Sequence, residues 1–192
     1  VEDYKVTITE TTKTPMSLGN LVWLDGNQDG QQTKGEFGLV GAVVTLMNAD
    51  GTVARDLDNL VVAAQTIDAT GAYKCNNLPE GDYIVKVVPP AGYLVTSGGA
   101  DANTDTSDTD NNCVANNNGA QTLAVKLTAG AEPTTDGDDA NGNLTVDCGF
   151  YQSKTPLYSL GNQVWVDDGA GVTANANNGK RDTGEAAVMN GV

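Results

Sequence analysis

The sequence predicts an all-β protein built as a β-sandwich, and three observations support this fold class. Apolar and polar residues alternate with a period of two, and no segment sustains a helical stripe of apolar residues. Gly, Asn, Asp and Thr are plentiful while aromatic residues make up 5% of the chain, which favours turns and strands over helices. A sequence block also returns after a spacing of about one sandwich domain.

Seven segments show the alternation that is typical of strands. In residues 82–89, for example, Tyr83 and Val85 face one way while Ile84 and Lys86 face the other. Turn sequences such as NADG, DATG, LPEG and PPAG separate the segments. A further segment, residues 56–65, fits either a helical turn or a strand. The predicted strands cover residues 4–10, 20–24, 42–48, 72–77, 82–89, 121–127 and 144–151.

An internal repeat predicts how the chain divides into modules. KTPMSLGNLVWLD, residues 13–25, returns as KTPLYSLGNQVWVD, residues 154–167, with 142 residues between Ser17 and Ser159. We therefore interpret the sequence as a window on a longer array of tandem modules. The expected parts are residues 1–15 as the end of a preceding module or an N-terminal pairing strand with a linker, residues 16–155 as one complete module, and residues 156–192 as the start of a second, incomplete module.

The charge balance and the composition argue against several classes of function. The chain carries 10 basic and 25 acidic residues, has a formal net charge of −15, and contains no histidine. This charge opposes binding to nucleic acid and to anionic lipid, and no apolar run approaches the ~20 residues that span a bilayer. The absence of histidine removes the usual general base and the usual zinc ligand. We expect no enzymatic activity, no nucleic-acid partner and no direct membrane insertion.

Residues 25–36, DGNQDGQQTKGE, predict the principal metal site. They match the calcium-loop motif D-x-[DN]-x-[DN]-G-x5-E at every defined position, with Gly30 at the sharp turn. Calcium takes about six to eight hard oxygen ligands, which this loop can supply. A solvated hairpin tip is the alternative, but the complete motif favours Ca²⁺. The predicted ligands are Asp25, Asn27, Asp29, the backbone carbonyl of Gln31, and Glu36.

Two long polar loops, residues 98–120 and 132–143, contain further acidic groups. Long loops without regular structure are usually functional or disordered, and closely spaced carboxylates repel one another unless a cation lies among them. We therefore predict a possible additional calcium site in residues 101–110, against the alternative of a solvated acidic loop. Its candidate ligands are Asp101, Asn103, Asp105, Asp108 and Asp110, and a weaker candidate group is Asp136, Asp138 and Asp139.

The second copy of the calcium loop is degraded. Seven additional residues separate its first and last acidic positions, and Gly179 stands where Gly30 stands in the first copy. The candidate ligands of this second copy are Asp167, Asn178 and Glu185.

Three cysteines allow one disulfide bond and one remaining thiol. Cys75 shares a strand face with Tyr73, and Cys148 shares one with Phe150, so both thiols are expected to point inward. A Cys75–Cys148 bridge across the core is the preferred pairing. Cys113 could replace either partner, and three unpaired thiols are the alternative.

Three sequence blocks resemble a known family, the B-type repeat domain of serine-aspartate repeat surface adhesins (the SdrD B-like domain), which is related to the B-type modules of collagen adhesins. The blocks are SLGNLVWLDGNQDGQQTKGEFGLVGAVVTL, TIDATGAYKCNNLPEGDYIVKVVPPAGYLVT and LTVDCGFY. The resemblance implies an immunoglobulin-like β-sandwich in tandem copies on a cell surface, with calcium-dependent rigidity. It implies a principal site at residues 25–36 and weaker sites in residues 101–110. The three cysteines depart from the family, and no Lys–Asn isopeptide bond is expected.

The expected function is that of a calcium-binding structural repeat module in an extracellular surface protein, either an adhesin stalk or a surface filament. Its expected partners are neighbouring modules of the same chain. The alternative is an adhesin module that binds a host or matrix protein, or further copies of this chain, through its loops or through strand addition by residues 4–10.

Overall fold

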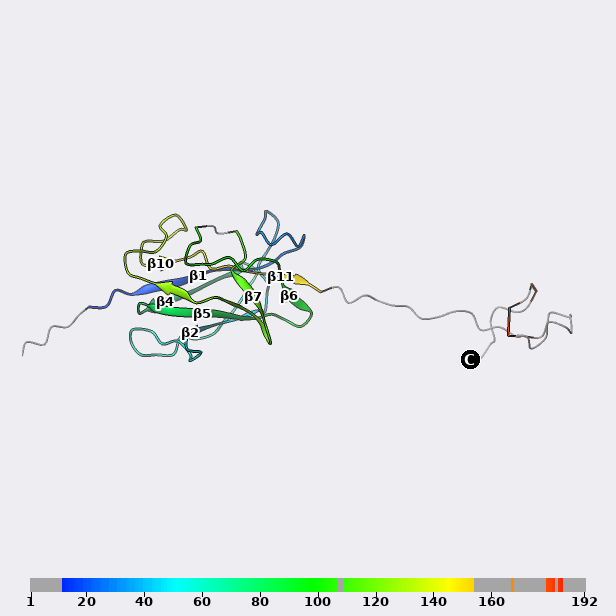
Figure 1. Ribbon diagram of the computed structural model, residues 1–192, viewed down its shortest axis with the longest axis horizontal. Coiled ribbons are helices and arrows are strands. Elements are labelled where there is room, and N and C mark those ends of the chain that lie inside the picture. The colour runs from blue at the N-terminus through cyan, green and yellow to red at the C-terminus, as the bar shows by residue number, and fades with distance from the viewer. Residues whose placement is uncertain (1–11, 107–108, 154–166, 168–178, 182, 185–192) are drawn as a thin grey trace, which may run out of the picture. The chain divides into compact units, whose positions relative to one another are not determined.

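The computed structural model describes residues 12–106, 109–153, 167, 179–181 and 183–184. The chain divides into two compact units, residues 1–154 and 155–192. Within the described residues the regular structure consists of strands alone, arranged in two sheets (Figure 1). The predicted all-β sandwich is therefore confirmed. The predicted strand at residues 4–10 lies outside the described part of the chain.

The first sheet is organised around β1 (Met16–Leu24). β4 (Ala72–Leu78) pairs antiparallel with β1 along one edge. β10 (Gly142–Asn143) and β11 (Cys148–Gln152) pair with it in parallel, and β6 (Tyr93–Val95) adds to β11. Because β1 and β11 are adjacent and parallel, the end of β1 lies beside residues that are more than a hundred positions away in the sequence.

The second sheet is organised around β5 (Gly81–Val88). β2 (Val43–Asn48) pairs antiparallel with β5, and so do β8 (Gly119–Thr122) and β9 (Val125–Leu127). The sheet is completed by β3 (Gln65–Thr66) beside β2 and by β7 (Cys113–Asn116) beside β8.

The core lies between the two sheets, and the alternation in β5 shows why. Tyr83, Val85 and Val87 are buried while Lys86 on the opposite face is only partly buried, as the sequence pattern predicts. The same alternation places apolar side chains of both sheets in one cluster, which is the arrangement of a β-sandwich. Members from the first sheet include Leu18, Val22 and Phe150, and members from the second include Val44, Leu46 and Val85.

Some strand boundaries differ from the prediction. Residues 121–127 contribute to two short strands, β8 and β9, and β11 begins later than predicted, at Cys148. Residues 56–65 contain neither the helical turn nor the full strand, because only Gln65 belongs to a strand. The sequence did not predict β6, β7 or β10, and the last two lie within the predicted loops 98–120 and 132–143. All three are very short, so alternation has too few residues to be recognised.

The disulfide bond joins Cys113 on β7 to Cys148 on β11, and Cys75 is a buried free thiol. The preferred Cys75–Cys148 pairing is therefore wrong. Cys75 pairs with Leu18 and Cys148 pairs with Val22, so both belong to the sheet around β1 and lie four positions apart along it. At ~3.3 Å per residue this exceeds the ~7 Å that a disulfide can span. Cys113 and Cys148 have a Cα–Cα distance of 5.2 Å, and their bridge joins the two sheets.

We expect the native protein to contain no rapidly reacting thiol and the denatured protein to contain one. Cys75 is 3% exposed, and burial raises the pKa of its thiol to about 11, which suppresses the reactive thiolate. A thiol-reactive chromogenic reagent, applied before and after addition of denaturant, measures the number of reactive thiols in the native and in the denatured protein. Peptide mapping without reduction should find the thiol in the Cys75 peptide, and a free Cys113 or Cys148 would contradict the observed pairing.

Candidate metal centre

The loop at residues 25–36 connects β1 to the segment that leads into β2, and the sandwich fixes both of its ends. The backbone N–H of Leu24 donates to the carbonyl of Phe37 at 2.9 Å, which closes the loop at its base. The N–H of Asp25 donates to the carbonyl of Phe150 on β11 at 2.7 Å. Strand pairing thus does for this loop what flanking helices do in a helix–loop–helix calcium site.

Asp25 is the buried anchor of the loop, with 1% of its surface exposed. Its carboxylate accepts hydrogen bonds from the N–H of Gln28 at 2.6 Å, the N–H of Gly30 at 2.9 Å and the hydroxyl of Thr96. Gly30 has a φ of +79°, and a Cβ there would lie 2.5 Å from the carbonyl oxygen of Ser97. Both the backbone conformation and the close approach therefore require glycine.

The remaining candidate ligands of this loop are turned towards its own backbone. Asn27 Oδ1 accepts from the N–H of Asp29 at 3.0 Å, and Asp29 Oδ1 accepts from the N–H of Gln31 at 2.8 Å. Glu36 reaches back across the loop, and its Oε1 accepts from the N–H of Gly26 at 2.8 Å. Within the described part of the chain, no three Asp, Glu, His or Cys side chains converge as metal ligands.

The acidic segment at residues 101–110 divides into two parts. Asp101 and Asn103 bond to each other, and Asn103 Oδ1 accepts from the N–H of Lys126 on β9 at 2.6 Å. Asp105 and Asp110 instead face each other, and the side chain of Asp105 also accepts from the Asn112 amide at 2.8 Å. The fifth candidate, Asp108, lies outside the described residues.

The carboxyl groups of Asp105 and Asp110 influence each other electrostatically. Burial, the hydrogen bond that protonated Asp110 donates to Asp105, and the negative charge of Asp105 together raise the pKa of Asp110 to about 6. Asp110 Oδ1 is buried and has no hydrogen-bond partner. Below pH about 6 the pair holds a proton, and above it both carboxylates are charged, so a nearby divalent cation would offset their repulsion.

We expect Asp110→Asn to stabilise the calcium-free protein at neutral pH. The folded state holds the Asp110 proton up to pH about 6, whereas the ordinary Asp pKa of 3.8 applies when the chain is unfolded. The folded state therefore binds more protons between these values, and this group makes stability fall as the pH rises through that window. In the variant, this decrease in stability with rising pH should be absent. The variant should therefore melt at a higher temperature than the wild type at pH 7 in chelator. A lower melting temperature at every pH would contradict the pairing.

The two candidate loops are in contact. The hydroxyl of Thr96 donates to Asp25, and the N–H of Gln32 donates to the carbonyl of Thr109, next to Asp110. The sequence offered no signal for Thr96, because an uncharged residue outside both motifs does not suggest a metal site. The principal loop and the acidic segment therefore form one continuous polar region.

The second copy retains one contact of the first. Asp167 Oδ2 accepts from the N–H of Gly179 at 2.7 Å, and Gly179 has a φ of +74°. These are the relations that Asp25 and Gly30 have in the first copy, despite the longer insertion. Asn178 and Glu185 lie outside the described residues.

The weaker acidic group occupies the loop before β10. Asp136 Oδ2 accepts from the N–H of Leu144 at 2.7 Å, and Asp138 Oδ2 lies 3.1 Å from Lys74 Nζ. Asp136 and Asp138 each retain a second carboxylate oxygen that is buried and without a partner. The lysine supplies positive charge at Asp138, which reduces the need for a cation there.

The two packed sheets, with acidic loops whose ends are fixed by strands, define this protein as a β-sandwich module with a candidate metal centre. The chain belongs to the SdrD B-like domain family, whose model matches residues 16–150. In the described part of the chain, no helix is long and apolar enough to cross a membrane.

The similar proteins include two from Staphylococcus aureus. Serine-aspartate repeat-containing protein E of strain MSSA476 is 36% identical over 90% of this chain, and serine-aspartate repeat-containing protein D of strain Newman is 34% identical over 92%. The matches cover 12% and 10% of those proteins, so this chain spans about a tenth of their length. Among solved structures, the minor pilin GBS52 of Streptococcus agalactiae matches 78% of this chain and 49% of its own, with 16% identity and a TM-score of 0.44.

Proposed function

We propose that this chain is a calcium-binding structural repeat module of an extracellular surface protein, and that Ca²⁺ stiffens the sandwich and the array it belongs to. The observation that carries the proposal is the loop at residues 25–36. It has the complete calcium motif, and strand pairing through Leu24 and Asp25 fixes its base. The donor set is made of carboxylate, amide and carbonyl oxygens, which are the hard ligands that calcium prefers.

The residues that would hold the ion are Asp25, Asn27, Asp29, Gln31 and Glu36. In this structure the acidic groups among them accept hydrogen bonds from backbone N–H groups of the same loop. A bound cation would supply the positive charge that these carboxylates otherwise obtain from N–H and hydroxyl dipoles. Because the ion binds the folded loop and not the unfolded chain, its binding free energy adds to the stability of the fold.

The Asp105–Asp110 pair supports a second site in the acidic segment. Burial and the neighbouring Asp105 raise the pKa of Asp110, and a bound cation would favour the charged form of both carboxyl groups. The contact between Gln32 and Thr109 places this segment against the principal loop. Calcium at both positions would order the two loops together and would make the stiffness of the module depend on ambient calcium.

The proposed location is the cell surface or the secreted fraction, with neighbouring modules of the same chain as the main partners. Disulfide bonds persist in oxidising compartments, and the Cys113–Cys148 bridge fits such a location. The role proposed here is structural and not enzymatic.

We expect calcium to raise the melting temperature of the full chain. A site with a Kd of ~0.1 mM in ~1 mM calcium would add about 1.4 kcal/mol, or about 5 °C for a domain of this size. Calorimetry in chelator, in calcium and in magnesium measures the shift, and magnesium should give a smaller one because it requires a tighter octahedral site. Asp29→Asn should reduce the calcium shift, while Asp50→Asn, in an exposed turn outside the loops, should not. Equal melting temperatures in chelator and calcium would refute the proposal.

A further inference from the structure

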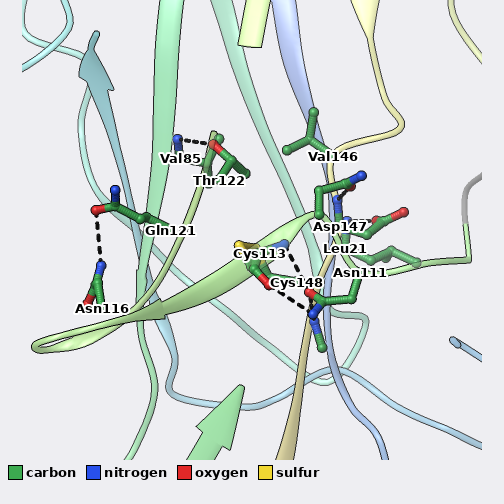
Figure 2. The surroundings of a disulfide bond; sticks show 12 residues. Leu21, Val85, Asn111, Cys113, Asn116, Gln121, Thr122, Val146, Asp147 and Cys148 are labelled. Atoms are coloured by element: carbon green, nitrogen blue, oxygen red, sulfur yellow. Dashed lines mark hydrogen bonds between the residues drawn. A yellow bond between two sulfur atoms is a disulfide. The ribbon is translucent and has the colours of Figure 1, made fainter. Parts of the chain in front are cut away.

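The Cys113–Cys148 bridge lies at the centre of a set of hydrogen bonds between two segments (Figure 2). Beside it, the N–H of Asn112 donates to the carbonyl of Asp147 at 2.9 Å. The N–H of Asp147 donates in return to Asn112 Oδ1 at 2.7 Å. The residues just before Cys113 and Cys148 are therefore joined in both directions.

Asn111 joins the same two segments through the residue that follows Cys148. Its Oδ1 accepts from the N–H of Gly149 at 3.2 Å and from the N–H of Cys113 at 3.1 Å. Its Nδ2 donates to the carbonyl of Thr96 at 3.1 Å. The disulfide thus holds residues 111–113 against residues 147–149, with hydrogen bonds before and after it.

Asn111 and Asn112 each donate a further hydrogen bond that connects them to one of the candidate calcium loops. Asn112 Nδ2 donates to the carboxylate of Asp105 at 2.8 Å. Asn111 holds the backbone of Thr96, whose hydroxyl donates to the carboxylate of Asp25. Asn111 and Asn112 are 1% and 0% exposed, so both asparagine side chains are held within the fold.

We propose that the Cys113–Cys148 bridge, acting through Asn111 and Asn112, positions the ligands of both calcium loops. This inference rests on the calcium-binding function proposed above. With the bridge present, Asp25 and Asp105 are held in place before the ion arrives. Without it, the ion must order the two loops as it binds, and this ordering reduces its affinity. Asn111, Asn112 and Thr96 are positioning residues, because they act on the ligands and not on the ion.

The test is a calorimetric titration of the full chain with calcium chloride. Cys113→Ala/Cys148→Ala is compared with the wild type and with Cys75→Ala, which removes a buried thiol outside this set of bonds. Circular dichroism first establishes a temperature at which all three proteins are folded in chelator. We expect calcium affinity to fall about fivefold or more in the double variant and to stay unchanged in Cys75→Ala. An unchanged affinity in the double variant, with equal losses of melting temperature in chelator and calcium, would overturn the proposal.

A second variant tests the connection if the double variant does not fold in chelator. Thr96→Val removes the hydroxyl that donates to Asp25 and nearly preserves the side-chain volume, whereas Thr96→Ser retains the hydroxyl. We expect weaker calcium binding in Thr96→Val and recovery in Thr96→Ser. Equal affinity in all three proteins would overturn the inference alone. A wild-type protein that gives no calcium heat and no melting shift would remove the proposed function and the inference together.

Discussion

Removing the Cys113–Cys148 bridge is expected to lower the free energy of unfolding by about 4 kcal/mol. The two cysteines are separated by 35 residues and join the two sheets of the sandwich. Without the bridge, the unfolded chain gains the freedom of that closed segment, while the native contacts change little. The expected effect is therefore larger than that of most single substitutions.

The measurement is urea unfolding of Cys113→Ala/Cys148→Ala in chelator, which separates the effect of the bridge from any effect of calcium. Cys75→Ala is the matched control, because it also shortens a buried cysteine side chain but breaks no bridge. The control should lose about 1 kcal/mol. If the double variant lost no more than the control, the bridge would not constrain the unfolded chain as described here.

Replacing Asp25 by alanine should cost about 3 kcal/mol even without calcium. Its buried carboxylate accepts from two backbone N–H groups and from the Thr96 hydroxyl, and truncation leaves these donors without their acceptor. If Asp25 is also a calcium ligand, the variant should show no calcium-dependent increase in melting temperature. The two effects are measured by urea unfolding in chelator and by calorimetry in calcium.

Asp50→Ala provides the comparison for Asp25→Ala. Asp50 accepts two hydrogen bonds from Thr52 in an exposed turn, so its removal tests the loss of a turn carboxylate in solvent. We expect a much smaller loss of stability and an unchanged calcium response. A loss as large as that of Asp25→Ala would show that burial and the contact with Thr96 contribute little.

Strand alternation predicted the fold class and the direction of side chains. In β5, the period of two places Tyr83, Val85 and Val87 on one face, and the structure buries that face. The same rule could not find β6 and β7, which are too short to show alternation. β7 also follows an acidic segment, so its sequence is easily taken for part of the loop.

Strand alternation could not predict which cysteines form the disulfide bond. It placed Cys75 and Cys148 on inward faces, and both are buried. It does not indicate which sheet a strand joins, and the pairing depends on that. Cys75 and Cys148 flank β1 in the same sheet, whereas Cys113 reaches Cys148 from the other sheet.

The candidate site was predictable where its residues are contiguous in sequence. The motif at residues 25–36 identifies its own candidate ligands, because their spacing is fixed by one loop. Thr96, Asn111 and Asn112 could not be identified in this way. Thr96 reaches Asp25, 71 positions away, because β6 pairs with β11 and β11 pairs with β1, and those pairings depend on the whole sheet.

The most direct test of the calcium proposal is diffraction from crystals grown in millimolar calcium, with anomalous differences collected at long wavelength. We expect a peak in the loop at residues 25–36, with oxygen atoms of Asp25, Asn27, Asp29 and Glu36 about 2.4 Å from it. A map without such a peak, in which Glu36 still accepts from Gly26 and Asp29 still accepts from Gln31, would contradict the proposal.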